Sequence, residues 1–220
     1  PSMKKTYVTL VPSGANFILM PPADDFPVEC RGFTMNIRRD LAFPITNILA
    51  DTATLEDEVT VIALRQVNES DPYADENYYL LRRELDFLRP GTPEQPGYQL
   101  IDVSMPKDTS SEALIQTFTK LVEVFPDYCQ CLVDTTFGGK PAAFTLLEFL
   151  QSAHQLFDGV DIERILYREV QRRYDPEQKR SIDIGWYYTD VSALFHLSSI
   201  AGLASGSSNG RDFLRSLLNA

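Results

Sequence analysis

Cysteine and histidine are scarce in this sequence, and their scarcity narrows the kinds of site it can contain. The three cysteines, Cys30, Cys129 and Cys131, are odd in number and too few for a disulfide framework, and they fit a reducing cytoplasm. Cys129 and Cys131 alternate along a predicted strand and so face one side of it, which is typical of small core residues. The only histidines are His154 and His196, and we therefore predict no metal site and no cofactor.

Long apolar runs and an excess of positive charge are also missing. No apolar run has the roughly 20 residues that a membrane span needs, and no basic-then-apolar signal opens the chain. We expect a cytoplasmic protein with no membrane segment within these residues. Lysine and arginine number 20 against 31 acidic residues, giving a net charge of −11. We therefore expect no broad basic face for duplex nucleic acid, and any polyanionic ligand has to be small and held locally.

What the sequence does contain is a regular alternation of strand-like and helix-like segments. Apolar, β-prone runs predict five main strands, at 5–11, 58–64, 98–103, 128–133 and 160–167. Amphipathic stretches predict helices at 40–51, 75–88, 111–125, 142–156 and 190–203. This alternation predicts an α/β fold, Rossmann-like, with a mostly parallel sheet flanked by helices on both faces. The 220 residues suffice for one such domain.

The remaining stretches are less regular. We expect a short hairpin or irregular strands at 17–20 and 28–36, an exposed charged bend at 168–180 and a short strand at 182–184. Residues 4–204 are expected to form one domain. Residues 205–220, rich in Gly, Ser and Asn at their start, predict a flexible linker and the beginning of a further helix, an arrangement that suggests an effector beyond it.

The most informative stretch is the loop 134–141, with the sequence DTTFGGKP, between a buried strand and a helix. Its glycines let the backbone turn sharply, and Pro141 suits the first position of the helix that follows. Free backbone N–H groups and the positive end of the helix dipole then lie beside Lys140 and favour an anion. An anion site and an ordinary strand-to-helix turn are both compatible with this loop. The helix after it carries its apolar residues near helical spacing, at Phe144, Leu147, Leu150, His154 and Phe157.

A second loop, Pro12-Ser13-Gly14-Ala15-Asn16, follows the first predicted strand. Its small, hydrogen-bonding residues can contact a polar ligand or form a plain turn. In parallel sheets, ligands bind beyond the carboxyl ends of the strands, where both loops lie. If the first and fourth predicted strands are neighbours, the two loops form one site. Arg65 ends the second strand, where it either aims at a ligand or is solvated.

With both loops placed, the chain resembles a CARF domain, the CRISPR-associated Rossmann-fold sensor of type III systems. The resemblance is to the branch with a D-x-T-H-G-x-[RN] motif after the fourth strand. Asp134, Thr136 and Gly138 match that motif, while Phe137 replaces its histidine and Lys140 its arginine or asparagine. The loop at 13–16 also fits the family pattern. The segment 182–184 and the helix from Asp190 resemble the family's closing strand and helix, so the resemblance covers most of the chain.

The resemblance implies a homodimer that binds a cyclic oligoadenylate, tetra- or hexa-adenylate, across its two-fold axis in antiviral defence. The ligand-binding residues it implies are Ser13, Gly14, Ala15, Asn16, Asp134, Thr135, Thr136, Phe137, Gly138, Gly139 and Lys140. Threonine hydroxyls and glycine N–H groups would donate to phosphates or ribose hydroxyls, and Lys140 would neutralise charge. Phe137 would pack against an adenine or face the core.

Two functions follow from the resemblance. The first is an allosteric sensor that passes ligand binding to an effector. The second is a metal-independent ring nuclease, which cleaves the ring by attack of a ribose 2′-hydroxyl, with Lys140 and Thr136 as candidate catalytic residues. The sensor is favoured because the motif has no histidine to act as a general acid or base. An unrelated nucleotide-binding α/β domain is a third interpretation.

Overall fold

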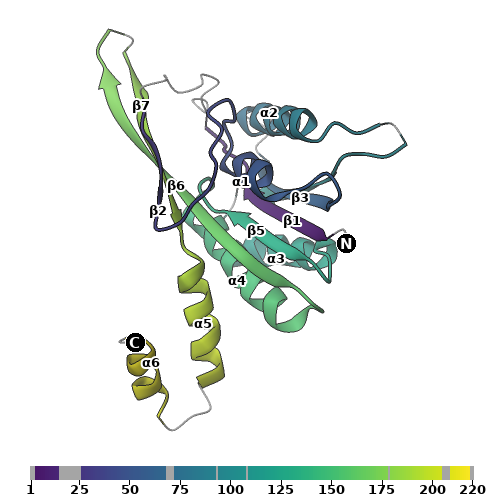
Figure 1. The fold of residues 1–220 in the computed structure, drawn as a ribbon, viewed down its shortest axis with the longest axis vertical. Helices are drawn as coiled ribbons and strands as arrows, with labels where there is room; N and C mark the ends of the chain where they lie inside the picture. Colours follow the sequence, from purple (N-terminus) through teal and green to yellow (C-terminus); the bar gives the residue numbers. More distant parts are fainter. Residues whose placement is uncertain are drawn as a thin grey trace.

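Seven strands form one twisted sheet in the order β2-β7-β6-β5-β1-β3-β4 (Figure 1). We analysed a computed structural model, which describes residues 3–14, 26–67, 72–92, 94–107, 109–177, 179–204 and 209–218. The strands are β1 (Lys4–Leu10), β2 (Val28–Arg31), β3 (Glu58–Val67), β4 (Gln99–Pro106), β5 (Gln130–Asp134), β6 (Asp161–Asp175) and β7 (Arg180–Asp190). Neighbouring strands run parallel except β6 and β7. The predicted α/β, mostly parallel, Rossmann-like fold is confirmed.

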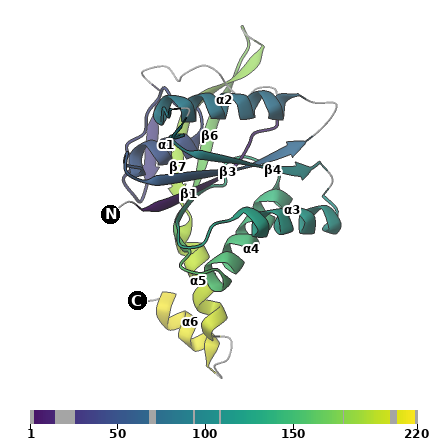
Figure 2. The same cartoon turned by 90° about the vertical axis from the view of Figure 1, so that its right-hand side faces the viewer.

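Helices cover both faces of the sheet. They are α1 (Pro44–Thr52), α2 (Tyr73–Leu88), α3 (Ser111–Val124), α4 (Lys140–Leu156), α5 (Ser192–Ala204) and α6 (Gly210–Leu218). Figure 2 shows α1 and α2 on one face and α3 and α4 on the other, while α5 and α6 extend away from the sheet. Among the described residues, no helix is long and apolar enough to cross a membrane.

Alternating side chains along the central strands divide the interior into two cores. In β1, Val8 and Leu10 face the core under α3 and α4, whereas Tyr7 faces the core under α1 and α2. Each of the three side chains is fully buried, and burying one apolar side chain of this size stabilises the fold by about 1.5–3 kcal/mol. Cys129 and Cys131 lie buried in the first core, as the sequence predicts for small core residues.

Two helices differ from the sequence prediction in ways that proline and packing explain. α1 begins at Pro44 rather than at residue 40, because the residue before a proline avoids helical angles, and Phe43 is extended at φ −89° and ψ 133°. In α4 the buried residues are Leu146, Phe149, Leu150 and Ala153. The apolar face that the sequence analysis assigned to α4 is therefore wrong at Phe144, which is exposed.

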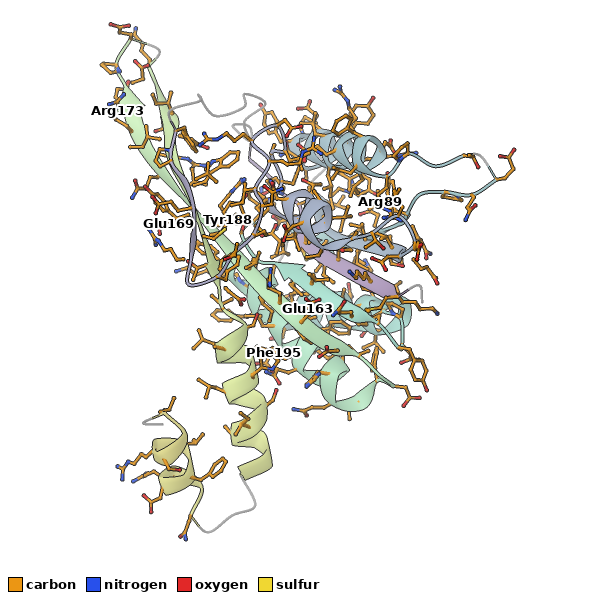
Figure 3. The ribbon with its side chains drawn as sticks, in the orientation of Figure 1. Arg89, Glu163, Glu169, Arg173, Tyr188 and Phe195 are labelled. Carbon is orange, nitrogen blue, oxygen red and sulfur yellow. The ribbon has the colours of Figure 1, made fainter. Side chains whose placement is uncertain are left out.

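The predicted bend at 168–180 is wrong. β6 continues through Asp175 and pairs antiparallel with β7 from Leu166↔Asp190 to Asp175↔Arg180, so the predicted short strand at 182–184 is part of a longer one. The outer part of this hairpin extends past the rest of the sheet, and Figure 3 shows Arg173 near its far end. Both of its faces meet water there, so its sequence lacks the apolar alternation by which half-buried strands are recognised. The predicted segment 17–20 and most of the predicted linker, 205–208, lie outside the described residues.

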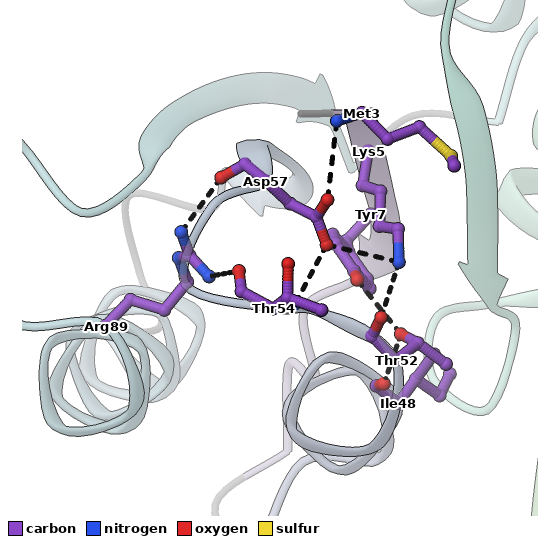
Figure 4. A network of polar contacts seen from close by, with 8 residues as sticks. All are labelled: Met3, Lys5, Tyr7, Ile48, Thr52, Thr54, Asp57 and Arg89. Carbon is purple, nitrogen blue, oxygen red and sulfur yellow. Dashed lines mark hydrogen bonds and ion pairs between the residues drawn. The ribbon is translucent and has the colours of Figure 1, made fainter. Parts of the chain in front are cut away.

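A polar network fixes the opposite end of the sheet, where β1 begins (Figure 4). Arg89 is only 8% exposed and donates to three backbone carbonyls, those of Thr54 at 2.7 Å, Asp57 at 2.9 Å and Gly97 at 2.7 Å. Lys5 Nζ lies 3.3 Å from the Asp57 carboxylate. Each of the three guanidinium nitrogens of Arg89 thus donates to a carbonyl of the protein, so we assign this network to stability and place the candidate site at the other end of the strands.

Candidate functional site

The sheet order brings the two predicted loops to the same edge. β1 pairs parallel with β5, from Lys5↔Gln130 to Thr9↔Asp134, so the first and fourth predicted strands are neighbours. The chain after β1 and the chain after β5 therefore leave the sheet side by side. A Cβ added at Gly138 would lie 3.1 Å from the Cδ1 atom of Leu10, the last residue of β1. Ala15 and Asn16, the rest of the first predicted loop, lie outside the described residues.

One pocket is shared by both loops. Ser13 from the first loop and Gly138 and Gly139 from the second line a narrow cavity of about 40 Å³. Its other walls come from the residue after β1, the ends of β3 and β4, and the starts of α3 and α4 with the segment before α3. The lining residues there are Val11, Gln66, Met105, Pro106, Thr109, Leu114, Thr117, Pro141, Ala142 and Thr145. On this measure one water molecule needs about 10–15 Å³, so the cavity has room for a few waters or for one small group of a larger ligand.

At the pocket's edge, the backbone of the second loop is exposed, so a ligand can come close to it. Gly138 has φ +86°, a left-handed conformation that glycine adopts without strain. α4 begins at Lys140, before the predicted start at residue 142, so Pro141 occupies its second position rather than the first. The residue before this helix is Gly139, which has no side chain to cap it, and Gly138, Gly139 and Lys140 are exposed. The first N–H groups of α4 and the positive end of its dipole thus face the rim beside a lysine.

The front half of the loop turns inward instead. Asp134 is fully buried, and its carboxylate accepts hydrogen bonds from Thr9 Oγ1 and from the backbone N–H of Thr136, both at 2.9 Å. Burial raises the pKa of the Asp134 carboxyl, although its hydrogen bonds and the charge of Arg168 oppose that rise. Asp134 therefore fixes the loop to β1 from inside the protein.

The two threonines of the motif attach the loop to β6. Thr135 donates to the carbonyl oxygen of Leu166 through its backbone N–H at 2.9 Å and through Oγ1 at 3.1 Å. Thr136 Oγ1 accepts the backbone N–H of Arg168 at 2.9 Å. These threonine side chains are half-buried and engaged with the protein. The rim that is free to meet a ligand is consequently made by the glycines, Lys140 and Ser13.

A buried arginine lies beneath this loop. Arg168 is 4% exposed, and its guanidinium carbon lies 5.6 Å from the ring centre of Phe137 and 4.3 Å from that of Trp186. Its Nη1 donates to the carbonyl oxygen of Ala42 at 2.8 Å. The ring of Phe137 also packs edge-on against Phe43, with centroids 6.5 Å apart. Of the two alternatives for Phe137, the structure has the ring facing the core.

Glu84 of α2 adds a second, partly buried carboxylate near Arg168. It accepts hydrogen bonds from the N–H groups of Ala42 at 2.6 Å and Phe43 at 3.4 Å, and from Thr46 Oγ1 at 2.6 Å. Burial raises the pKa of this carboxyl, and these hydrogen bonds and the positive charge of Arg168 oppose the rise. Glu84 thus holds the start of α1. The positive charge of Arg168, beneath the candidate site, acts on both the Glu84 and the Asp134 carboxyls.

Sequence reasoning missed this buried cluster. It placed Arg168 in an exposed bend and gave Glu84 no role. The available signal was alternation, because Leu166, Arg168 and Val170 lie on one face of β6, and both apolar members contact the core under α1. The other arginine considered, Arg65, is held in ion pairs with Asp75 and Asp102.

The arrangement can hold an anion and offers little for acid–base chemistry. The described residues contain no group of three metal-ligating side chains. Both histidines lie away from the loop, His154 near the carboxyl end of α4 and His196 on α5, with ring centroids 6.5 Å apart. Comparison with known proteins adds no assignment, since no family model matches the chain and no curated protein is similar enough to match it.

Proposed function

We propose that this protein is a sensor for a cyclic oligoadenylate, a ring of four or six nucleotides. In this proposal the ligand is bound by a homodimer, and its binding is passed to an effector in antiviral defence of the CRISPR type III kind. The observation that supports the proposal is the meeting of Ser13 with Gly138 and Gly139 in one pocket at the carboxyl edge of the sheet. The motif residues of the loop and the α/β fold agree with the family resemblance.

The chemistry of the rim suits phosphate groups. Backbone N–H groups at the start of a helix donate hydrogen bonds to phosphate oxygens without carrying a full charge. Lys140 supplies a full positive charge beside them. With a net charge of −11, the protein as a whole repels a polyanion, so binding depends on these local donors. A cyclic ligand with repeated phosphates also suits two identical rims related by a two-fold axis.

Titration calorimetry with cyclic tri-, tetra- and hexa-adenylate tests the proposal directly. We expect saturable binding of the tetra- or hexa-adenylate ring, with one ring bound per two protein chains. The absence of heat and of any ligand-dependent rise in melting temperature with all three rings would contradict the proposal.

The ring-nuclease alternative is less well supported by the geometry. Thr136, one of its two candidate catalytic residues, already has its hydroxyl oxygen bonded to the N–H of Arg168. Hours of incubation with the ring followed by chromatography separate the two functions. We expect intact ring, whereas linear adenylates would favour the nuclease.

A further inference from the structure

The outer part of the β6–β7 hairpin is a two-stranded arm with no other strand beside it. β5 pairs with β6 only as far as Asp134↔Leu166, and β2 pairs with β7 only from Val28↔Trp186 onward. Residues 171–185, which we call the arm, therefore have two free strand edges among the described residues and extend past the sheet (Figure 1). An isolated two-stranded hairpin is at best marginally stable in water, so a surface that receives the arm would stabilise it.

The arm differs in charge from the rest of the chain. Its sequence has four basic and three acidic residues, a net charge of +1, whereas the remaining residues carry −12. Arg172 pairs with Asp183, but Arg173 and Lys179 are exposed and form no ion pair among the described residues. Next to Arg173, Tyr174 is 61% exposed. Arginine and tyrosine contribute strongly to protein interfaces, so the arm has the side chains that suit an acidic partner surface.

A surface of matching chemistry lies at the other end of β6. Tyr128, just before β5, is 68% exposed. Its backbone N–H donates to the carbonyl oxygen of Asp158 at 2.6 Å, and the N–H of Asp161 donates to that of Cys129 at 2.9 Å, so both acidic residues lie beside Tyr128. Asp158, Asp161 and Glu163 are exposed, and their carboxylates form no ion pair within the part of the chain that the structure describes. This end of β6 thus combines an exposed aromatic ring with unpaired negative charge.

We propose that the arm of each chain docks on this acidic surface of a second copy, so that two identical contacts hold the homodimer together. This inference rests on the proposed function, which requires a dimer, and it names the surfaces that form the dimer. The two regions lie toward opposite ends of one strand, as Figure 3 shows for Glu163 and Arg173. Two antiparallel β6 strands therefore bring each arm to the acidic surface of the other chain, the isologous arrangement of a two-fold dimer.

Strand geometry places the two-fold axis beside the candidate site. Strand residues rise about 3.3 Å each, so Asp161 and Arg173 lie ~40 Å apart along β6 and cannot meet within one chain. When Arg173 of one copy meets Asp161 of the other, the axis passes beside Tyr167, halfway between them. The residues on either side of Tyr167 are the ones bonded to Thr135 and Thr136 of the loop. The candidate sites of the two chains then lie next to the axis, as a ring shared by two chains requires.

Light scattering over a dilution series tests this docking through the charges of the arm. The arm variant combines Arg173→Glu with Lys179→Glu, and the matched control combines Arg82→Glu with Arg83→Glu on α2, which changes the net charge equally. All four side chains are exposed, so the variants keep the fold, which thermal unfolding verifies. We expect the dimer dissociation constant to rise at least about 10-fold in the arm variant and far less in the control, because only the arm variant sets like charges against each other in the contact.

A charge exchange supplies the second test. Asp158→Lys with Asp161→Lys should weaken the dimer as the arm variant does, and joining these two substitutions to the arm variant should strengthen it again, since opposite charges then meet. In wild type alone, raising NaCl from about 0.1 M to 1 M should weaken the dimer, because salt screens these attractions.

A wild type that stays monomeric overturns the proposal, as does an arm variant that dimerises like the control or a charge exchange that restores nothing. Binding of single-stranded poly(A) by wild type and not by the arm variant would make the arm a nucleic-acid contact and also overturns it. Calorimetry with the ring is a separate measurement. A dimer that depends on the arm and binds no ring refutes the proposed function, whereas a ring-binding dimer that the arm variant leaves intact refutes only this inference.

Discussion

Replacing Arg168 by methionine removes one positive charge from the interior while keeping an unbranched side chain of similar length. The guanidinium is 4% exposed, contacts the rings of Phe137 and Trp186, and donates to the Ala42 carbonyl. Its positive charge also opposes the cost of burying the Asp134 and Glu84 carboxylates. The substitution leaves those two carboxylates in the interior without their cation.

The expected loss of unfolding free energy is about 2–3 kcal/mol, because Arg168 forms no direct ion pair among the described residues and acts through one charge-assisted hydrogen bond and its aromatic contacts. The hydrogen bond to Ala42 alone accounts for about 1.5–3 kcal/mol of this, since its donor is charged. Desolvated contacts between a cation and aromatic rings add up to about 2 kcal/mol, although the contributions overlap and are not additive. A loss of this size is a large fraction of the 5–15 kcal/mol that holds a typical domain together.

Urea unfolding followed by tryptophan fluorescence measures this loss. Trp186 is the only tryptophan of the chain and lies against Arg168, so its emission reports on this part of the protein. The matched control is Arg172→Met on the same strand, where the side chain is 59% exposed and pairs with Asp183 at 3.1 Å. An exposed pair contributes about 0–1 kcal/mol. If Arg168→Met costs no more than Arg172→Met, the interior cation does not support the site as we describe.

The double variant Arg168→Met with Asp134→Asn tests the charge argument separately. Removing the carboxylate charge together with the cation should cost less than the sum of the two single losses, because no buried charge is then left unbalanced. Strictly additive losses would mean that the two groups do not interact.

Two further predictions concern the loop and the buried carboxylates. Gly138→Ala should cost about 1–2 kcal/mol in urea unfolding, because Gly138 has φ +86° and a new Cβ would lie 3.1 Å from Leu10 Cδ1; an unchanged midpoint would contradict the left-handed turn. Burial raises the pKa of the Glu84 carboxyl above its ordinary 4.5, so folding favours its protonated form. The stability that this preference contributes is present below pH 4.5 and is lost as pH rises through the raised folded pKa. Unfolding free energies measured at steps from pH 4.5 to pH 7.5 should therefore fall less steeply with pH in Glu84→Gln than in wild type, and equal slopes would contradict the assignment.

Much of the fold could be predicted because the central elements follow simple periodicities. β1, β3 and β5 are short apolar runs, and the helices between them carry apolar residues at helical spacing, so the alternation alone indicates a parallel sheet. Ser110 stands directly before α3, and its hydroxyl accepts the Ala113 N–H at 3.3 Å, as the preference of serine for the N-cap position leads one to expect. A joint site requires that β1 and β5 are neighbours in the sheet. This pairing is one of the strand orders that parallel sheets of this kind allow, so it could be considered from the sequence.

The rest depended on three-dimensional contacts that a linear pattern does not reveal. The β6–β7 hairpin is charged on both faces once it leaves the sheet, so it resembles a loop in sequence. Arg168 is buried only because two aromatic rings and a carbonyl from three other segments surround it. The sequence left Phe137 open between an adenine and the core, and it placed Phe144 on the apolar face of its helix. In the structure the loop ring turns to the core and the helix ring faces water, because of contacts that the linear pattern does not show.

The most direct test of the central claim, that the loop at the start of α4 holds the phosphates of a nucleotide ligand, is the affinity of Lys140→Ala for the ring that wild type prefers. Calorimetry should show binding weakened by about 1–3 kcal/mol, or ~5- to 150-fold, as expected for the loss of one charge-assisted contact. Lys4→Ala removes an equal charge from an exposed lysine at the opposite end of β1 and should leave affinity unchanged. Equal affinities of Lys140→Ala and wild type would remove Lys140 from the site and contradict the account.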